Sequence, residues 1–116
     1  MINITRSGNN ASHQPSISDN GRYISFVSSA SNLTGDGNAF QDAFRYDAQT
    51  FTFQNLTHGA NSATSMAKNT ITPDGRYVTF QSTASNLVVG DTNGQSDVFL
   101  YDTQLNNRIN ITLNNT

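Results

Sequence analysis

Apolar and polar residues alternate along two stretches of the chain that are near copies of each other. In Ser18–Leu33 and in Thr72–Leu87, an Asn-Gly or Asp-Gly pair precedes a run in which side chains of similar character recur at every second residue. A period of two residues is that of a β-strand. Asn or Asp followed by Gly tolerates the positive φ angles of a tight hairpin. Each stretch therefore predicts a strand, a turn and a returning strand.

The two copies extend well beyond these stretches. Gly21 and Gly75 are 54 residues apart, and Tyr46 and Tyr101 are 55 residues apart, so one extra residue falls in a loop between them. Self-similarity at a period of roughly 50 residues is the signature of propellers and solenoids, whose units cannot bury both faces alone. The predicted division is a first repeat, 1–57, which carries an extra N-terminal strand, and a second repeat, 58–116.

Each repeat reads as four strands, and no window shows the apolar spacing of a helix. Strands are predicted at 1–5, 12–18, 22–28, 43–46 and 51–57, and again at 66–72, 76–82, 98–101 and 107–113. The strand at 1–5 matches Asn55-Leu56-Thr57 and Asn110-Ile111-Thr112, so one element occurs three times. Apolar residues lie on both faces of the middle strands, which favours a sheet covered on each side by another sheet, as in a propeller blade. A sandwich is the competing interpretation, although it does not need two similar halves.

Composition excludes several classes of function. The chain has a net charge of −2, and its six Lys and Arg residues are scattered, so it lacks the basic stripe that nucleic acid requires. No apolar run approaches the roughly 20 residues of a membrane span. Cysteine is absent, which excludes disulfides and thiolate metal sites. The abundance of Asn, Ser and Thr resembles exported bacterial surface proteins, so we expect an extracellular or periplasmic location.

The second repeat carries a recognisable pattern. Pro73–Leu87 followed by Gly90–Asp102, and in weaker form Asp19–Asp47, resembles the WD40-like repeats of the PD40 family, which form the blades of TolB-like bacterial β-propellers. The resemblance implies an all-β fold of two four-stranded antiparallel β-propeller blades. It also implies a scaffold or interaction role and no particular reaction, so we expect no enzyme activity.

Two blades cannot close a ring, so we expect the chain to bind copies of itself. Three copies would give six blades, and a filament or a place in a larger propeller are the alternatives. Catalysis has little support, because His13 and His58 stand at no metal-ligand spacing and no G-x-S-x-G motif is present. A carbohydrate-binding propeller is the other hypothesis: Phe40, Phe51 and Phe53 have no aromatic counterpart in the second repeat and would suit a protein partner or a sugar. Trp, the usual sugar platform, is absent.

Two acidic loops are candidate calcium sites. They supply alternating Asp and Asn oxygens around a bend, and Ca²⁺ takes six to eight oxygen ligands. The candidate ligands are Asp91, Asn93 and Asp97 in the second repeat, and Asp36, Asn38 and Asp42 in the first. The spacing differs from that of an EF-hand, and the same side chains suit turn caps that bond neighbouring backbone N–H groups. Both interpretations remain open from the sequence.

Overall fold

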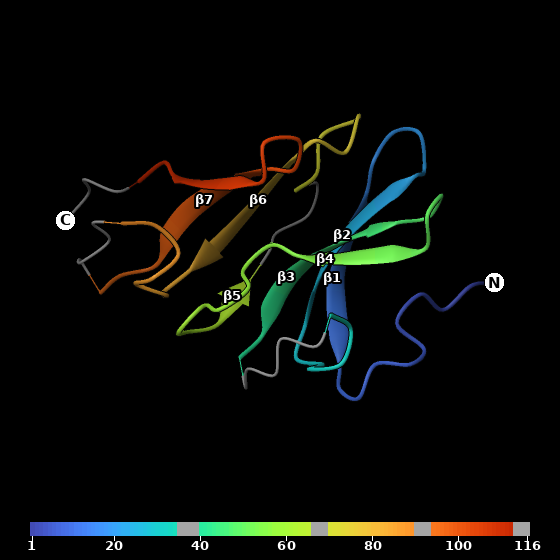
Figure 1. Ribbon diagram of the computed structural model, residues 1–116, viewed down its shortest axis with the longest axis horizontal. Coiled ribbons are helices and arrows are strands. Elements are labelled where there is room, and N and C mark those ends of the chain that lie inside the picture. The colour runs from blue at the N-terminus through green and yellow to red at the C-terminus, as the bar shows by residue number, and fades with distance from the viewer. Residues whose placement is uncertain (35–39, 66–69, 90–93, 113–116) are drawn as a thin grey trace.

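The computed structural model describes residues 1–34, 40–65, 70–89 and 94–112, which form two four-stranded antiparallel sheets (Figure 1). The first sheet has the order β1 (Ser12–Ile17), β2 (Tyr23–Ser28), β3 (Asp42–Asp47), β4 (Thr52–Asn55). The second has the order β5 (Thr64–Ser65), β6 (Tyr77–Ser82), β7 (Asp97–Asp102), β8 (Asn107–Asn110). Neighbours in sequence are neighbours in each sheet, and the predicted all-β fold is confirmed.

The predicted hairpin turns are present in both sheets. Gly21 has a φ of 73° and Gly75 a φ of 75°, a region that glycine enters without strain. At the following turns, Asp47 Oδ1 accepts the N–H of Gln49 at 2.9 Å, and Asp102 Oδ1 accepts the N–H of Gln104 at 3.0 Å. Through these Asx-type bonds, the two aspartates cap the turns after β3 and β7.

The element that occurs three times is a turn, so the predicted strand at 1–5 is wrong. The Asn3 Oδ1 atom accepts the N–H of Thr5 at 3.1 Å, and Asn55 and Thr57 make the same bond at 2.9 Å. A side-chain acceptor two residues away offers the backbone an alternative to a sheet ladder. The strand predicted at 66–72 lies mostly outside the described residues: β5 lies just before it, residues 66–69 are not described, and Ile71 forms an isolated bridge with Val78.

Each sheet has two chemically different faces, because strand residues alternate between them. One face, which we call the aromatic face, carries a Phe, a Phe and a Tyr: Phe26, Phe44 and Tyr46 in the first sheet, and Phe80, Phe99 and Tyr101 in the second. The opposite face, which we call the mixed face, carries aliphatic and polar residues. Its members are Tyr23, Ser25, Val27, Ala43, Arg45 and Gln54 in the first sheet, and Tyr77, Thr79, Gln81, Val98, Leu100 and Ile109 in the second.

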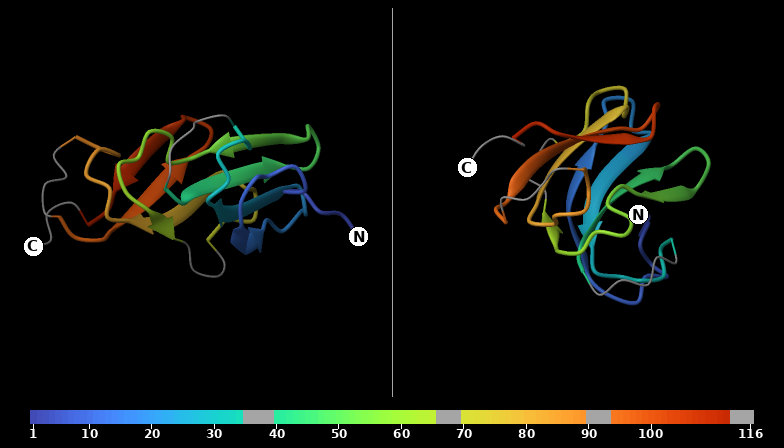
Figure 2. Two further views of the ribbon diagram at one scale, coloured as in Figure 1. Left: turned by 90° about the horizontal axis from the view of Figure 1, so that it is seen from below. Right: turned by 60° about the vertical axis from the view of Figure 1, so that its left-hand side comes forward.

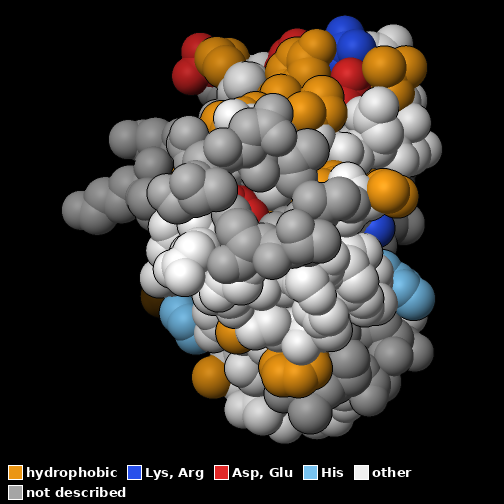
Figure 3. All heavy atoms as spheres, turned by 90° about the vertical axis from the view of Figure 1, so that its left-hand side faces the viewer, with side chains coloured by type: hydrophobic (Ala, Val, Ile, Leu, Met, Phe, Trp, Pro, Cys, Tyr) orange, Lys and Arg blue, Asp and Glu red, His pale blue; other side chains and the backbone are white. Residues whose placement is uncertain are grey.

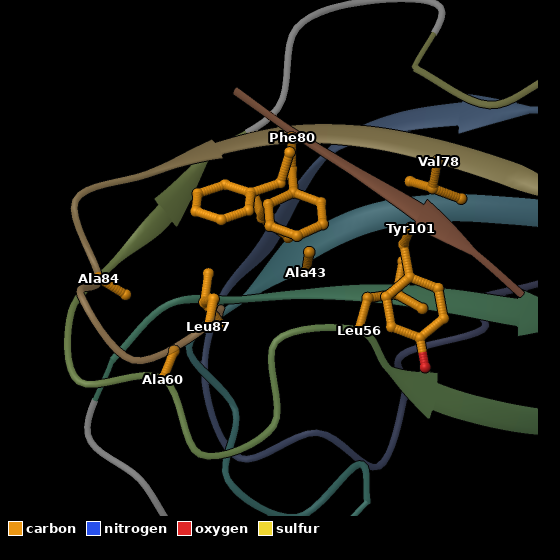
Figure 4. Close-up of a cluster of buried hydrophobic side chains, with 10 residues drawn as sticks. Ala43, Leu56, Ala60, Val78, Phe80, Ala84, Leu87 and Tyr101 are labelled. Atoms are coloured by element: carbon orange, nitrogen blue, oxygen red, sulfur yellow. The ribbon is translucent and has the colours of Figure 1, made fainter. Parts of the chain in front are cut away.

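The main core lies where the mixed face of the first sheet meets the aromatic face of the second. Val27 and Ala43 pack with Phe80, Phe99 and other side chains of the second sheet (Figure 4). Leu56, which directly follows β4, is fully buried in the same cluster. The first sheet and the turn after it therefore cover the second sheet.

The aromatic face of the first sheet forms a smaller cluster on the other side. Phe26 and Phe44 stack with ring centroids 5.5 Å apart, and Ile4 and Leu33 pack against them. Ile4 stands here in the place that Leu56 holds on the second sheet. The N-terminal turn thus covers the first sheet as the turn after β4 covers the second.

The molecule is elongated, with principal extents of 44 × 29 × 23 Å (Figures 1 and 2). In the part of the chain that the structure describes, no helix is long and apolar enough to cross a membrane.

Candidate functional site

The contact between the two sheets, which we call the junction, centres on Tyr23 and Gly75. A methyl group placed on Gly75 would overlap the ring of Tyr23, so only glycine fits beneath this ring. The guanidinium carbon of Arg45 lies 4.3 Å from the centroid of the same ring, on the mixed face. Arg45 also donates to the carbonyl of Gly75 at 2.9 Å. Burial of Arg45 lowers the pKa of its guanidinium, although the group remains charged at neutral pH.

Polar side chains complete the junction toward its edges. Arg45 donates to Thr103 Oγ1 at 3.1 Å, and Gln54 Nε2 donates to Asn106 Oδ1 at 3.1 Å. Deeper in the contact, the hydroxyls of Ser25 and Thr70 are 3.1 Å apart, within hydrogen-bonding distance. These bonds add directional specificity to the apolar packing of the core.

The residues equivalent to Tyr23 and Gly75 lie on the outward faces of the two sheets, where no other sheet covers them. Gly21 is the counterpart of Gly75, yet a methyl group placed on Gly21 would meet no atom within 4 Å. Tyr77 is the counterpart of Tyr23 and lies half-buried on the outward mixed face of the second sheet. On that face, Gln81 and Val98 are exposed, whereas their counterparts Val27 and Ala43 are fully buried. Both halves of a junction are thus present on the outside of the molecule.

Each sheet contains one strong ion pair that fixes its hairpin. Arg22 makes two hydrogen bonds to Asp47, at 2.9 and 2.8 Å, and Arg76 makes two to Asp102, at 3.0 and 2.9 Å. The guanidinium of Arg22 holds the pKa of Asp47 well below its usual range, and Arg76 lowers the pKa of Asp102 in the same way. These pairs join the turn before the second strand to the end of the third, so they position the residues of the junction.

Hollows occur on both outward faces. One, of about 290 Å³, is bordered by Thr79, Gln81 and Val98 of the second sheet's mixed face. Another, of about 150 Å³, is bordered by Ile4, Ile24 and other residues beside the first sheet's aromatic face. The first only reaches the lower end of the roughly 300–1,000 Å³ of a typical small-molecule pocket, and the second is about half of that lower end. On the side of the molecule shown in Figure 3, hydrophobic side chains gather at the top of the view beside a few charged ones, and smaller groups lie near the bottom. These features suit the docking of a protein surface better than the enclosure of a small molecule.

The structure describes only two of the candidate calcium ligands. Asp42 and Asp97 are buried, whereas Asp36, Asn38, Asp91 and Asn93 lie outside the described residues. The Thr57 hydroxyl donates to Asp42 Oδ1 at 2.8 Å and accepts the N–H of Ala43 at 3.0 Å. The two aspartates have equivalent roles, because Thr112 donates to Asp97 at 2.9 Å.

These bonds give Asp42 and Asp97 a structural role in fastening the turn after the fourth strand to the third strand. Calcium binding by the two loops stays a prediction. Calorimetric titration of chelator-treated protein with Ca²⁺ tests it: heat and a raised melting temperature would support the metal, and the absence of both would reject it.

The two histidines lie in different elements of the fold. Within the described ranges, no group of three His, Asp or Glu side chains could hold a metal ion. His13 lies in β1 of the first sheet, and His58 lies in the exposed turn that follows Leu56.

The three phenylalanines singled out by the sequence have different surroundings. Phe53 packs into the first sheet's cluster, where its ring centroid is 4.8 Å from that of Tyr46, so it is not a free platform. Phe40 is partly exposed, and Phe51 is 77% exposed. Phe51 also has a φ of 59°, which is unusual for a large side chain. Among these three, Phe51 is the strongest candidate for a contact with another molecule.

Comparisons with known proteins bear on the fold. Neither a protein-family model nor a curated protein sequence matches the chain. Among solved structures, a putative TolB from Agrobacterium tumefaciens is similar, with a TM-score of 0.59 and 18% identity over 88% of this chain and 30% of that one. The β-propeller domain of the Trilobed protease from Pyrococcus furiosus is similar with a TM-score of 0.55 and 14% identity, over 90% of this chain and 28% of that one.

The extent of these matches indicates what the two sheets represent. The chain spans less than a third of the length of either propeller structure, which fits two blades taken from a larger number. The low identities support the fold alone. The chain therefore has a β-propeller-like fold, and its two sheets correspond to part of the set of blades in a propeller.

Proposed function

We propose that the chain is a non-catalytic β-propeller scaffold that assembles with copies of itself, so that each outward face is covered by the face of another copy. One observation carries the proposal: Tyr23 packs on Gly75 inside the chain, while the equivalent Tyr77 and Gly21 face outward. Each of the two surfaces that join the blades is thus offered once more, on the outside of the molecule. Contacts of this head-to-tail kind close into rings or continue as filaments.

The preferred assembly is a ring of three chains with six blades. Propellers typically contain roughly four to eight blades, and three copies of a two-bladed chain fall within that range. A filament results if the rotation between copies does not close. In either assembly the surfaces available to other partners are the blade edges and loops, which is where a scaffold would bind a further protein.

Electron microscopy of the purified chain tests the proposal. Closed particles with six radial densities would support the ring, and extended fibres would support the filament. Single two-bladed particles at every concentration would contradict self-assembly. A glycan array run on the same material tests the carbohydrate-binding alternative, which predicts that specific glycans are retained.

A further inference from the structure

The junction inside the chain relies on polar contacts at its outer edge. Gln54 donates to Asn106 Oδ1, and Arg45 donates to Thr103 Oγ1, each at 3.1 Å. Gln54 lies opposite Arg45 in the register of β3 and β4, so the two polar side chains are neighbours on the mixed face. The junction can therefore be compared, pair by pair, with the surfaces that face outward.

Both members of the first polar pair are replaced by apolar residues on the outward faces. The counterpart of Gln54 is Ile109, which lies opposite Leu100 in the register of β7 and β8. The counterpart of Asn106 is Phe51, and both residues have a positive φ at the same place in the turn. Ile109 is 47% exposed and Phe51 is 77% exposed. The polar pair Gln54 and Asn106 thus corresponds to the apolar pair Ile109 and Phe51. The members of this apolar pair lie on the two opposite outward sides of one chain, so they can meet only between two copies.

The second polar pair changes in the same direction. The counterparts of Arg45 and Thr103 are Leu100 and Ala48. Leu100 lies on the outward mixed face of the second sheet, and Ala48 lies beside the outward aromatic face of the first. The two replacements match each other, because the residues that would meet are apolar on both sides.

A third pair keeps its chemistry. Ser25 and Thr70 share a hydrogen bond inside the junction, and their counterparts Thr79 and Ser16 also carry hydroxyl groups. Two contacts with backbone carbonyls have no equivalent. The N–H of Asp19 donates to Pro73 at 3.1 Å, whereas its counterpart Pro73 has no N–H. Arg45 donates to Gly75 at 2.9 Å, whereas its counterpart Leu100 has no side-chain donor. The outward faces therefore reproduce the junction with an apolar rim in place of a polar one.

We propose that the mixed face of the second sheet binds the aromatic face of the first sheet in a second copy, with Ile109 on Phe51, Leu100 on Ala48 and Tyr77 over Gly21. This assignment rests on the proposed function, because it names the residues through which the copies join. The exposed and strained Phe51 fits the role, since an apolar side chain held in a costly conformation is explained by a contact made in the assembly.

The change of chemistry also specifies the order of the blades. Two second sheets docked in the same manner would place Ile109 against Asn106, and two first sheets would place Gln54 against Phe51. Each mismatch leaves a polar group facing an apolar one, which disfavours the contact. The polar junction and the apolar contact therefore alternate, and the copies join in one direction.

A double-mutant cycle at Ile109 and Phe51 tests the proposal, with sedimentation velocity of the full chain as the measurement. Ile109→Gln and Phe51→Asn should each weaken self-association about tenfold, a factor that corresponds to about 1.4 kcal/mol. The double variant recreates the Gln–Asn pair of the junction and should recover part of the loss. Leu105→Gln is the control, because Leu105 is 65% exposed and lies in the turn before β8, outside the three residue pairs of the proposed contact.

The outcomes separate this inference from the proposed function. Coupling between the two substitutions, with no effect of Leu105→Gln, supports the assigned contact. If the parent chain assembles but the effects simply add, or if neither substitution weakens assembly, the contact is overturned and the scaffold proposal stands. If the parent chain does not assemble, both are overturned. Thermal melting of each variant identifies any loss of folding, and Phe51→Asn should raise the melting temperature because Asn tolerates a positive φ better.

Discussion

Tyr23 packs so closely over Gly75 that a methyl group on the glycine would overlap the carbons of the ring, whereas the same group on Gly21 would meet no atom. The two glycines hold equivalent places in the two hairpins and differ in φ by only 2° (73° and 75°). The difference between them is therefore whether another sheet covers the turn. The effect of an added methyl group at each of the two glycines therefore measures how tightly the junction is packed.

Substituting each glycine with alanine separates backbone strain from the junction. Gly21→Ala should cost about 1–2 kcal/mol in free energy of unfolding, the strain of an alanine at positive φ. Gly75→Ala carries the same strain, and displacement of the Tyr23 ring should add about 1–3 kcal/mol. Urea unfolding at a concentration where the chain is monomeric measures both. Equal losses would mean that the junction tolerates the extra group.

The hydroxyl of Thr57 should be important for stability, because it connects two buried groups. It donates to Asp42 and accepts from Ala43, and both partners are buried. Thr57→Val should cost about 1–3 kcal/mol, since a carboxylate loses a partner away from water. Thr5→Val is the matched control: within the described residues the Thr5 hydroxyl bonds only Asn3, in an exposed turn. A comparable loss in the control would argue against the role of the buried bond.

The two ion pairs should make folding sensitive to acid. Arg22 and Arg76 lower the pKa values of Asp47 and Asp102 in the folded state. A lowered folded pKa contributes stability above the unfolded value of about 4 and loses it as the pH falls below that value. The melting temperature should therefore drop between about pH 4 and pH 2. Asp102→Asn should lower the melting temperature at pH 7 and flatten this drop. Parallel pH curves for parent and variant would contradict the assignment.

The N-terminal turn should compete with self-assembly. Ile4 occupies the place on the first sheet that Leu56 holds on the second, and Ile111 is the third copy of this element. In a head-to-tail contact, Ile111 of one copy and Ile4 of the next would need the same place. Ile4→Asp should therefore strengthen association several-fold, whereas Ile2→Asp, in a side chain that is almost fully exposed, should not. Weaker association of Ile4→Asp with folding intact would show that the turn supports the contact.

Local chemistry made most of the fold predictable. Asn20-Gly21 and Asp74-Gly75 identify the hairpins, and the alternation after them gives β2 and β6 nearly at their observed bounds. The strand predicted at 1–5 failed for a local reason as well: an Asn followed by a Thr two residues later favours a side-chain turn.

The junction was harder to predict from the sequence, because the residues that meet in it are distant in sequence and differ in type between the two repeats. Arg45 and Thr103 are 58 residues apart, and their counterparts are Leu100 and Ala48. An alignment of the two repeats shows these four residues as two differences, Arg45 against Leu100 and Ala48 against Thr103. Only the structure shows that the differences fall in facing positions, and this relation turns them into a candidate binding surface.

The most direct test of the account is the mass of the chain in solution, measured by light scattering over a wide range of concentrations. One chain has a mass of 12.6 kDa. Self-assembly predicts that the mass rises with concentration, to three times this value for a closed ring of six blades or continuously for a filament. A mass that remains at that of one chain at every concentration would contradict it.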